Sequence, residues 1–313
     1  MKLFSGSSNP ILTQKIADIL KIPVAQSELV TFANSEIRVR IIEDVSDETC
    51  VIVQSTDNPT DSHLMELFFF ADALKRQNAA KVIAMIPYFG YARQDIQHRP
   101  GEAVSANVIV RFIEAIGFNE VLTFDIHDEA TAGVFNIPFR NLTTMDILAD
   151  VIKRYLNDDK KIAVNPDNIA VVSPDQGAIE KIRNFGSFLF GSDDFPLAVT
   201  EKKRDQEHIH QAHPYAIYGD IKKRVAIIVD DIVTSGSTLL PPIQMVKEAG
   251  AKIIIAAASH HDFSADAADK LKASPIDKFF TTDTIALKDF HKFDKLVEVS
   301  IAEKIAKELE KLI

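Results

Sequence analysis

Short apolar runs alternate along the chain with segments whose apolar residues recur every three or four positions. Six runs are continuously apolar, which is typical of strands buried on both faces of a parallel sheet. They are CVIVQS, KVIAMIPYF, EVLTFDIH, NIAVVSPD, RVAIIVDDI and KIIIAAASH. The strand and helix order predicts an α/β fold with mostly parallel sheets flanked by helices. The segment EIRVRI alternates strictly, which indicates a half-exposed strand near an edge.

Capping residues mark several helix ends. Proline at the first helical position, with a preceding polar side chain, is a typical start, and glycine in the left-handed region is a typical end. The predicted caps are Ser8 or Asn9 before NPILTQKIADIL, Asp61 or Ser62 before HLMELFFFADALKRQ, and Gly117, Gly186 and Gly250 at helix ends.

The pattern of strands and helices occurs twice. A chain of 313 residues exceeds what one core usually organises, so two domains are expected. We predict one domain over residues 1–146 and a second over 147–313. The terminal segment SIAEKIAKELEKLI is an amphipathic helix that could pack back on the first domain.

Composition narrows the classes of function. The net charge of −10 disfavours nucleic acid as a partner, because polyanion binding relies on a basic face. No apolar run is long enough to span a membrane, no signal peptide is recognised, and Cys50 alone gives no disulfide framework. We therefore expect a cytoplasmic protein. The basic clusters EKKRD and DIKKR are either solvated loops or have a local task.

The strongest candidate site is the stretch VAIIVDDIVTSGSTL. Ligands of open parallel sheets lie beyond the carboxyl ends of the strands, and two adjacent carboxylates stand there, followed by small and hydroxyl residues. Hydroxyl and backbone N–H groups before a helix suit a phosphate, and the carboxylates could accept ribose hydroxyls or hold Mg²⁺. An ordinary helix cap at Thr234 or Ser235 is the alternative. The residues are Asp230, Asp231, Thr234, Ser235, Gly236, Ser237 and Thr238.

Two further strand ends carry candidate metal ligands. VVSPDQGA places Asp175 before a glycine that lets the backbone approach a phosphate, although a plain turn would explain it equally well. TFDIHDEA places Asp125 and His127 two residues apart, and hence on one side of an extended segment. Histidine with carboxylates can ligate a divalent cation, and a structural histidine is the alternative.

Two loops of the first half carry polar residues that could contact a nucleotide. In PYFGYARQD, Arg93, Gln94 and Asp95 follow aromatic residues and a glycine, so that Arg93 could bind phosphate and an aromatic ring could stack on a base. In FANSEIRVR, the residues 34–36 form a turn between strands, which a simple hairpin explains.

Taken in order, seven motifs resemble the ribose-phosphate diphosphokinase family, and the resemblance covers almost the whole chain. They are FANSEIRVRI, QSTDNP with LMEL, IPYFGYARQD, VLTFDIH, VVSPDQGA, EKKR and VDDIVTSGSTL. The resemblance implies two phosphoribosyltransferase-like α/β domains. It also implies transfer of the β,γ-diphosphoryl group of ATP to the anomeric hydroxyl of ribose 5-phosphate, with Mg²⁺ as the metal and a homo-oligomer, dimer or hexamer, as the assembly.

The resemblance also implies a role for each matching residue. It assigns phosphate binding to Thr234, Ser235, Gly236, Ser237 and Thr238, ribose hydroxyls to Asp230 and Asp231, ATP to Asn34, Ser35, Glu36, Arg93, Gln94 and Asp95, Mg²⁺ to His127 and Asp175, and closure over the reacting phosphates to Lys202 and Arg204. Relatives usually have an acidic residue at position 234. A purine or pyrimidine phosphoribosyltransferase, or a silent protein that modulates an active partner, are the alternative functions.

Overall fold

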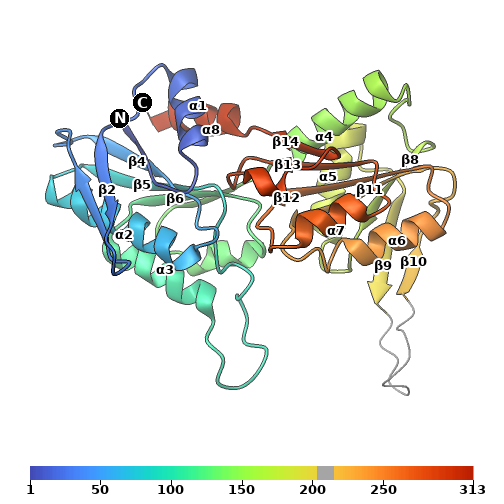
Figure 1. Cartoon of the computed structure of the whole chain (residues 1–313), viewed down its shortest axis with the longest axis horizontal. Helices are drawn as coiled ribbons and strands as arrows, with labels where there is room; N and C mark the ends of the chain where they lie inside the picture. Colours follow the sequence, from blue (N-terminus) through green and yellow to red (C-terminus); the bar gives the residue numbers. More distant parts are fainter. Residues whose placement is uncertain (203–214, 313) are drawn as a thin grey trace. The chain divides into compact units, whose positions relative to one another are not determined.

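The chain divides into two compact units (Figure 1). The computed structural model describes residues 1–202 and 215–312, and of residues 201, 202 and 215 it describes the backbone alone. Unit 1 comprises Met1–Thr143, Asp283–Ala286 and Ser300–Ile313, and unit 2 comprises Thr144–Thr282 and Leu287–Val299. The first passage between the units follows Thr143, where the sequence predicts a boundary at 146. Two late segments of the chain return to unit 1.

Unit 1 is built on a five-stranded parallel sheet whose order β1-β4-β5-β6-β7 follows the chain. Its strands are β1 (Lys2–Ser5), β4 (Thr49–Val53), β5 (Lys81–Ile86), β6 (Glu120–Phe124) and β7 (Phe139–Leu142). The predicted runs CVIVQS, KVIAMIPYF and EVLTFDIH form β4, β5 and β6. Their residues are nearly all buried, as continuous apolar strands between two helical layers must be.

Helices cover both faces of this sheet. Figure 1 shows α1 (Pro10–Leu20) and α8 (Ala302–Leu309) on one face and α2 (Thr60–Arg76) and α3 (Ser105–Ile116) on the other. Phe70 of α2 and Ile113 of α3 pack with Phe4 and Ile52 of the sheet. The short helical turns η1 (Glu129–Val134) and η4 (Glu310–Leu312) complete the unit. The terminal amphipathic helix therefore packs within unit 1, against α1.

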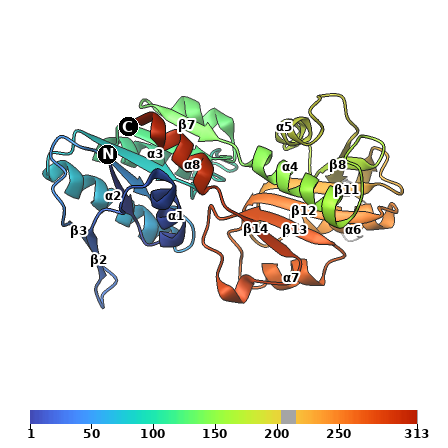
Figure 2. The same ribbon diagram turned by 90° about the horizontal axis from the view of Figure 1, so that it is seen from above.

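A separate antiparallel hairpin carries the alternating segment. It consists of β2 (Ser27–Thr31) and β3 (Ile37–Ile41), and Thr31 lies opposite Ile37. In β3 the arginines Arg38 and Arg40 are exposed and the aliphatic residues between them are partly buried, which confirms the half-exposed strand. Figure 2 shows the tip of the hairpin extending away from the five-stranded sheet.

Unit 2 is built on a seven-stranded sheet of order β10-β9-β8-β11-β12-β13-β14. All neighbouring strands are parallel except the pair β9 and β10. The strands are β8 (Ile169–Ser173), β9 (Leu197–Lys202), β10 (Tyr215–Tyr218), β11 (Val225–Ile232), β12 (Ile253–His260), β13 (Lys278–Thr282) and β14 (Leu296–Val299). Both units thus contain mostly parallel sheets flanked by helices, which confirms the predicted α/β class.

Side chains of β11 alternate between two hydrophobic clusters. Val225, Ile227 and Val229 pack in the cluster that contains α4 and α5, whereas Ala226 and Ile228 pack in the cluster that contains α6 and α7. The helices and turns are α4 (Met145–Arg154), η2 (Tyr155–Asp159), α5 (Ile179–Phe190), α6 (Leu240–Glu248), α7 (Ala267–Ala273) and η3 (Asp289–His291). A strand with apolar side chains on both faces therefore separates two helical layers.

The predicted helix ends are partly right. Asn9 caps α1, because its Oδ1 accepts from the N–H of Leu12 at 3.1 Å, and Gly117 ends α3 with φ of 96°. The predicted cap of α2 by Asp61 or Ser62 is wrong, since α2 begins after Pro59 with no side-chain cap.

Gly186 is also not a helix end. It lies inside α5, where an added Cβ would stand 2.2 Å from the ring of Phe195, so the glycine makes room for that ring. Gly191, with φ of 70°, ends the helix.

Candidate functional site

The sheet of unit 2 reverses its winding between β8 and β11. From β8 the chain leads to β9 on one side, and later it returns to β11 on the other side of β8. The two strands are parallel, with Ile228 opposite Val172. Open α/β sheets bind their ligands beyond the carboxyl ends of the strands at such a switch point. Asp175 of VVSPDQGA follows β8, whereas Asp230 and Asp231 lie at the carboxyl end of β11 and residues 234–238 follow it.

The two carboxylates of β11 are buried and held by the backbone. Asp230 is 7% exposed and Asp231 is 5% exposed. The N–H of Asp231 donates to Asp230 Oδ1 at 2.9 Å, and the N–H of Ile232 donates to Asp231 Oδ1 at 3.0 Å. Lys181 of α5 approaches Asp231 Oδ2 with its Nζ at 3.2 Å. Their positions are therefore fixed before any ligand arrives.

The acid groups at this crevice influence one another. Burial raises the pKa of Asp230 well above its usual range, and the neighbouring charge and hydrogen bond of Asp231 raise it further. The charge of Asp175, in the loop after β8, raises the same pKa to a smaller extent. A cation or a hydroxyl donor at this place would relieve the repulsion among them.

The residues 234–238 form a tight turn that precedes the helix. Gly236 has φ of 80°, a conformation that favours glycine, and its carbonyl accepts from the N–H groups of Leu239 and Leu240. Ser235 Oγ donates to Ser237 Oγ at 3.0 Å. Helix α6 begins at Leu240 without a side-chain cap, so neither Thr234 nor Ser235 is its N-cap. An ordinary cap therefore does not explain these hydroxyl residues.

The turn 234–238 is anchored on the segment that follows β12. The N–H of Val233 donates to the carbonyl of His260 at 2.9 Å, and the N–H of Ser264 donates to the carbonyl of Thr234 at 3.0 Å. Between these contacts lies His261, which is 2% exposed and has its Nδ1 3.1 Å from Thr281 Oγ1. A buried polar segment thus supports one side of the predicted phosphate turn.

The Asp175 loop is braced from below and exposed at its tip. Thr200 Oγ1 donates to the carbonyl of Pro174 at 2.7 Å, and Ser173 Oγ donates to the carbonyl of Asp175 at 2.6 Å. The side chain of Asp175 is exposed, and its Oδ1 accepts from the N–H of Ala178 at 2.9 Å. The Oδ1 atom of Asp175 therefore stabilises the loop. Its Oδ2 atom is a further acceptor of hydrogen bonds or a ligand for a cation.

In unit 1 the loop that carries Arg93, Gln94 and Asp95 follows β5. Arg93 and Gln94 are exposed, and Gln94 Oε1 accepts from Ser105 Oγ at 2.7 Å at the start of α3. Tyr91, with φ of 65°, donates its hydroxyl to Asp61 Oδ1 at 2.5 Å, and this hydrogen bond raises the pKa of the tyrosine. The loop is thus tied both to α3 and to α2.

The residues 34–36 form the tip of the β2–β3 hairpin, which confirms the predicted turn. Ser35 has φ of 71°, the N–H of Phe32 donates to the carbonyl of Glu36 at 2.8 Å, and the N–H of Glu36 donates to Asn34 Oδ1 at 3.2 Å. The side chains at the tip are exposed, and Arg38 stands 5.6 Å from the ring centre of Phe32. The tip presents polar atoms and a ring to its surroundings.

The prediction that Asp125 and His127 share one side of an extended segment is wrong. Asp125 has φ of 37°, so the chain is not extended there and the alternation of side chains fails. Asp125 is buried and accepts from Thr143 Oγ1 at 2.7 Å, whereas His127 is exposed. Only His127 therefore stays accessible to a ligand.

The remaining predicted residues lie at the edge of what the structure describes. Lys202 is the last residue of β9, and its side chain is outside the described part of the chain, as is Arg204 altogether. Within residues 1–202 and 215–312, no group of three histidine, cysteine, aspartate or glutamate side chains could hold a metal by itself. In the same part of the chain, no helix has the length and apolar content to cross a membrane.

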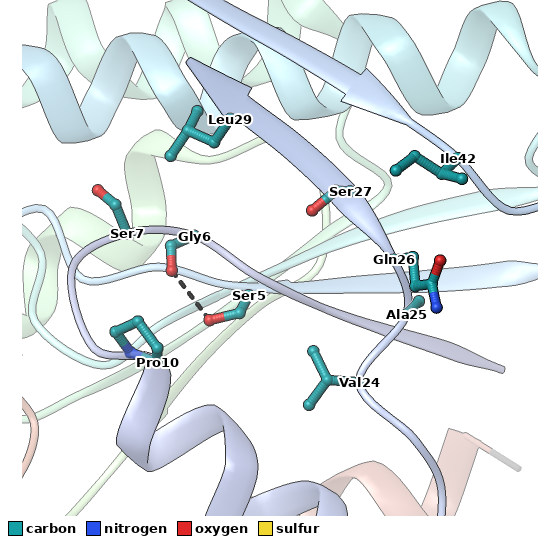
Figure 3. A pocket seen from close by; sticks show the side chains of 10 residues that line it. All are labelled: Ser5, Gly6, Ser7, Pro10, Val24, Ala25, Gln26, Ser27, Leu29 and Ile42. Carbon is teal, nitrogen blue, oxygen red and sulfur yellow. Dashed lines mark hydrogen bonds between the residues drawn. The ribbon is translucent and has the colours of Figure 1, made fainter. Parts of the chain in front are cut away.

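A cavity of about 500 Å³ lies elsewhere in unit 1, beside the end of β1 (Figure 3). Ser5, Ser7, Gln26, Leu29 and Ile42 are among its lining residues, and none of the predicted site residues lines it. Ser7 donates both its N–H and its hydroxyl to buried Glu66. The loop that carries Ser7 is therefore tied to α2.

Sequence reasoning missed Lys181 and Tyr91. Both contact a predicted site, Lys181 through Asp231 and Tyr91 through the loop of Arg93. Lys181 is the third residue of a helix, where a cation is unfavourable. A lysine at this position indicates that a tertiary contact compensates the cost. For Tyr91 the sequence carries no such signal, because a positive φ of 65° is unusual for a residue other than glycine.

Comparisons with known proteins agree over the whole chain. The N-terminal domain of ribose phosphate pyrophosphokinase matches residues 1–117, and the phosphoribosyl synthetase-associated domain matches residues 194–312. A ribose-phosphate pyrophosphokinase of Caldanaerobacter subterraneus is 38% identical over 96% of this chain and 91% of its own. One from Vibrio parahaemolyticus is 36% identical over 100% and 96%. The crystal structure of phosphoribosylpyrophosphate synthetase from Mycobacterium smegmatis superposes with a TM-score of 0.90 at 29% identity, covering 99% of this chain and 98% of that one.

Proposed function

Because the chain belongs to the ribose-phosphate pyrophosphokinase family, we propose that it transfers the β,γ-diphosphoryl group of ATP to the anomeric hydroxyl of ribose 5-phosphate. The products are 5-phosphoribosyl 1-diphosphate and AMP. The first of these is a precursor for nucleotide biosynthesis. The observation that carries the proposal is the pair of buried carboxylates followed by a hydroxyl-rich turn at the switch point of unit 2. This site suits a sugar phosphate.

We assign ribose 5-phosphate to unit 2. In this assignment Asp230 and Asp231 hydrogen-bond the ribose hydroxyls, because carboxylates are acceptors and repel phosphate. The turn 234–238 receives the 5-phosphate through hydroxyl and backbone N–H groups. Thr234 contributes no charge to the turn, so it does not oppose an anion.

We assign ATP to the loops of unit 1. The guanidinium of Arg93 supplies a fork for phosphate oxygens, and the amide of Gln94 and the carboxylate of Asp95 supply further polar contacts. The hairpin tip 34–36 offers an amide, a hydroxyl and a carboxylate for the polar edge of a nucleotide. We propose that the Arg93 loop and the hairpin tip contact the same nucleotide, either from one chain or from two copies of the chain.

Mg²⁺ fits the donors that the chain provides. His127 of unit 1 and Asp175 of unit 2 are both exposed, and we propose each of them separately as a Mg²⁺ ligand, the first through a ring nitrogen and the second through a carboxylate oxygen. Mg²⁺ usually combines one or two protein ligands with water and substrate phosphates. When bound, the ion would neutralise charge on the phosphate oxygens of ATP.

The transfer itself depends on positioning and on local cations. ATP and ribose 5-phosphate bring together about six negative charges, in a chain whose own net charge is −10. Lys202 and Arg204 belong to a basic cluster that would meet this demand and exclude water, which otherwise competes as the acceptor. We also propose a homo-oligomer, a dimer or a hexamer, located in the cytoplasm.

The test is a product assay with the purified chain, ATP, ribose 5-phosphate and Mg²⁺, followed by chromatography of nucleotides and by ³¹P spectroscopy of the diphosphate. We expect AMP and phosphoribosyl diphosphate in equal amounts, and neither product when Mg²⁺ is chelated. Release of diphosphate from phosphoribosyl diphosphate that depends on an added base would instead indicate a phosphoribosyltransferase. Failure to form either product, with and without inorganic phosphate, would refute the proposal.

A further inference from the structure

Lys181 of α5 forms an ion pair with one of the two buried carboxylates of β11. Its Nζ lies 3.2 Å from Asp231 Oδ2, with 21% of the lysine side chain and 7% of the aspartate side chain exposed. The other oxygen of Asp231 accepts from the N–H of Ile232. The pair is thus more buried than a surface ion pair, which usually contributes little.

The alternation along β11 separates the two carboxylates. Val225, Ile227 and Val229 face the cluster of α4 and α5, and the extended pattern continues to Asp231 on that side. Ala226 and Ile228 face the cluster of α6 and α7, and Asp230 continues that series toward the turn 234–238. Asp231 therefore points to the helix that carries Lys181, and Asp230 to the opposite layer.

The location of Lys181 is unfavourable for the helix itself. It is the third residue of α5, where the positive end of the helix dipole repels a cation. Its neighbours Ile182 and Phe185 supply the packing of α5 against the sheet, so the lysine is not needed for the core. Its contact with Asp231 is a favourable interaction that offsets this cost.

We infer that Lys181 is a positioning residue for ribose 5-phosphate, which holds the carboxylate of Asp231 in the orientation that receives a ribose hydroxyl. The inference rests on the proposed function and deepens it. Each carboxylate oxygen has two acceptor directions, so Asp231 can bind Lys181, the N–H of Ile232 and a ribose hydroxyl together. Asp230 is hydrogen-bonded by the N–H of Asp231, and Lys181 makes its ion pair with Asp231 and not with Asp230.

The test measures binding of ribose 5-phosphate to the full chain by titration calorimetry. Lys181→Met keeps the apolar stem and removes the charge, and we expect its Kd to rise about tenfold, the usual size of one charged hydrogen bond. Lys181→Arg is expected to restore binding to within about twofold. In turnover assays the KM for ribose 5-phosphate rises with the Kd, whereas the KM for ATP stays unchanged.

Lys15→Ala is the matched control. Lys15 of α1 also pairs with a buried aspartate, Asp283, at 2.8 Å, but in unit 1 and outside the predicted ribose site. Its loss is expected to leave the Kd for ribose 5-phosphate unchanged. A rise equal to that of Lys181→Met would refute the inference, since it would show a general loss of structure.

A double-mutant cycle separates positioning from a general structural role. In the background of Asp231→Asn, Lys181→Met is expected to change the Kd less than about twofold, whereas in the background of Asp230→Asn it keeps its full effect. Equal effects in the two backgrounds, or an unchanged Kd in Lys181→Met alone, would overturn the inference. If Lys181→Met does not fold, as judged by circular dichroism, Lys181→Gln takes its place in the cycle. If the unaltered protein does not bind ribose 5-phosphate, the proposed function fails. If the unaltered protein binds it and Lys181→Met binds it equally well, only the inference about Lys181 fails.

Discussion

Acidification is expected to weaken the folded state of unit 2 through His261. This histidine is 2% exposed, contacts the ring of Phe263 at 5.5 Å between centroids, and has an Nε2 without a hydrogen-bond partner in the part of the chain that the structure describes. Burial, helped by the nearby histidines His260 and His291, lowers its pKa to about 3. The folded state therefore excludes a proton that the unfolded chain accepts.

The sign and size follow from linkage between protonation and folding. The ordinary pKa is 6.5 and the folded one about 3, so the stability from keeping His261 neutral is fully present above about pH 6.5 and is lost as the pH falls toward 3. Between these values each pH unit removes about 1.4 kcal/mol. At about pH 5 the loss amounts to about 2 kcal/mol, a large fraction of the stability of a typical domain.

The measurement is urea unfolding followed by far-ultraviolet circular dichroism, since the chain contains no tryptophan. The free energy of unfolding is compared between about pH 7.5 and pH 5 for the unaltered chain and for His261→Gln, which does not titrate. We expect the decrease to be about 2 kcal/mol smaller in the variant. His98→Gln, which changes an exposed histidine, is the matched control and should follow the unaltered chain.

The comparison is of slopes, so a loss of stability at neutral pH in His261→Gln does not disturb it. Equal pH dependence in His261→Gln and the unaltered chain would refute the reasoning. An equally reduced dependence in His98→Gln would show that the effect belongs to histidines in general and not to the buried one.

Three further changes test other parts of the structure. Lys202→Ala should lower kcat far more than it weakens ribose 5-phosphate binding, because a transition-state contact leaves ground-state binding intact; equal losses would show the assigned role to be wrong. Tyr91→Phe removes the hydroxyl that ties the ATP loop to α2 and should raise the KM for ATP several-fold, with about 1 kcal/mol or less of lost stability in urea. Gly186→Ala puts a methyl 2.2 Å from the ring of Phe195 and should destabilise by about 1–3 kcal/mol, whereas Gly133→Ala, with open space around it, should not; similar values for both would contradict the packing argument.

The strands were predictable because burial on both faces requires an apolar residue at every position of the strand. The run from Val225 to Val229 is apolar at every position, and this pattern occurs only where two layers cover a strand. The charged pair that follows it was equally visible, since Asp230 and Asp231 interrupt an apolar strand at its carboxyl end. The order of the strands in the sheet, and with it the switch point, depends on pairing between residues that are distant in the sequence. No local sequence pattern predicts it.

The errors arose where tertiary contacts override local preference. Gly186 has the sequence context of a helix end, yet the close ring of Phe195 decides its place inside α5. Asp125 was expected in an extended segment, but its hydrogen bond with Thr143 accompanies a left-handed backbone conformation. Lys181 is separated from Asp231 by fifty positions of sequence, so only the fold brings them together.

The path of the chain has a consequence for folding during synthesis. Asn9, the N-cap of α1, donates to the carbonyl of Asp283, and the Asp283 carboxylate binds Lys15 of α1 and the N–H of Ile301. Ile305 and Leu309 of α8 are fully buried in the same unit. The ribosome therefore delivers the last part of the core of unit 1 only after unit 2 has emerged. Until then the first unit exposes an apolar face, a state that favours chaperone binding or aggregation. Expression of residues 1–143 alone should yield a poorly folded fragment, and no single cut divides the chain into two self-sufficient pieces.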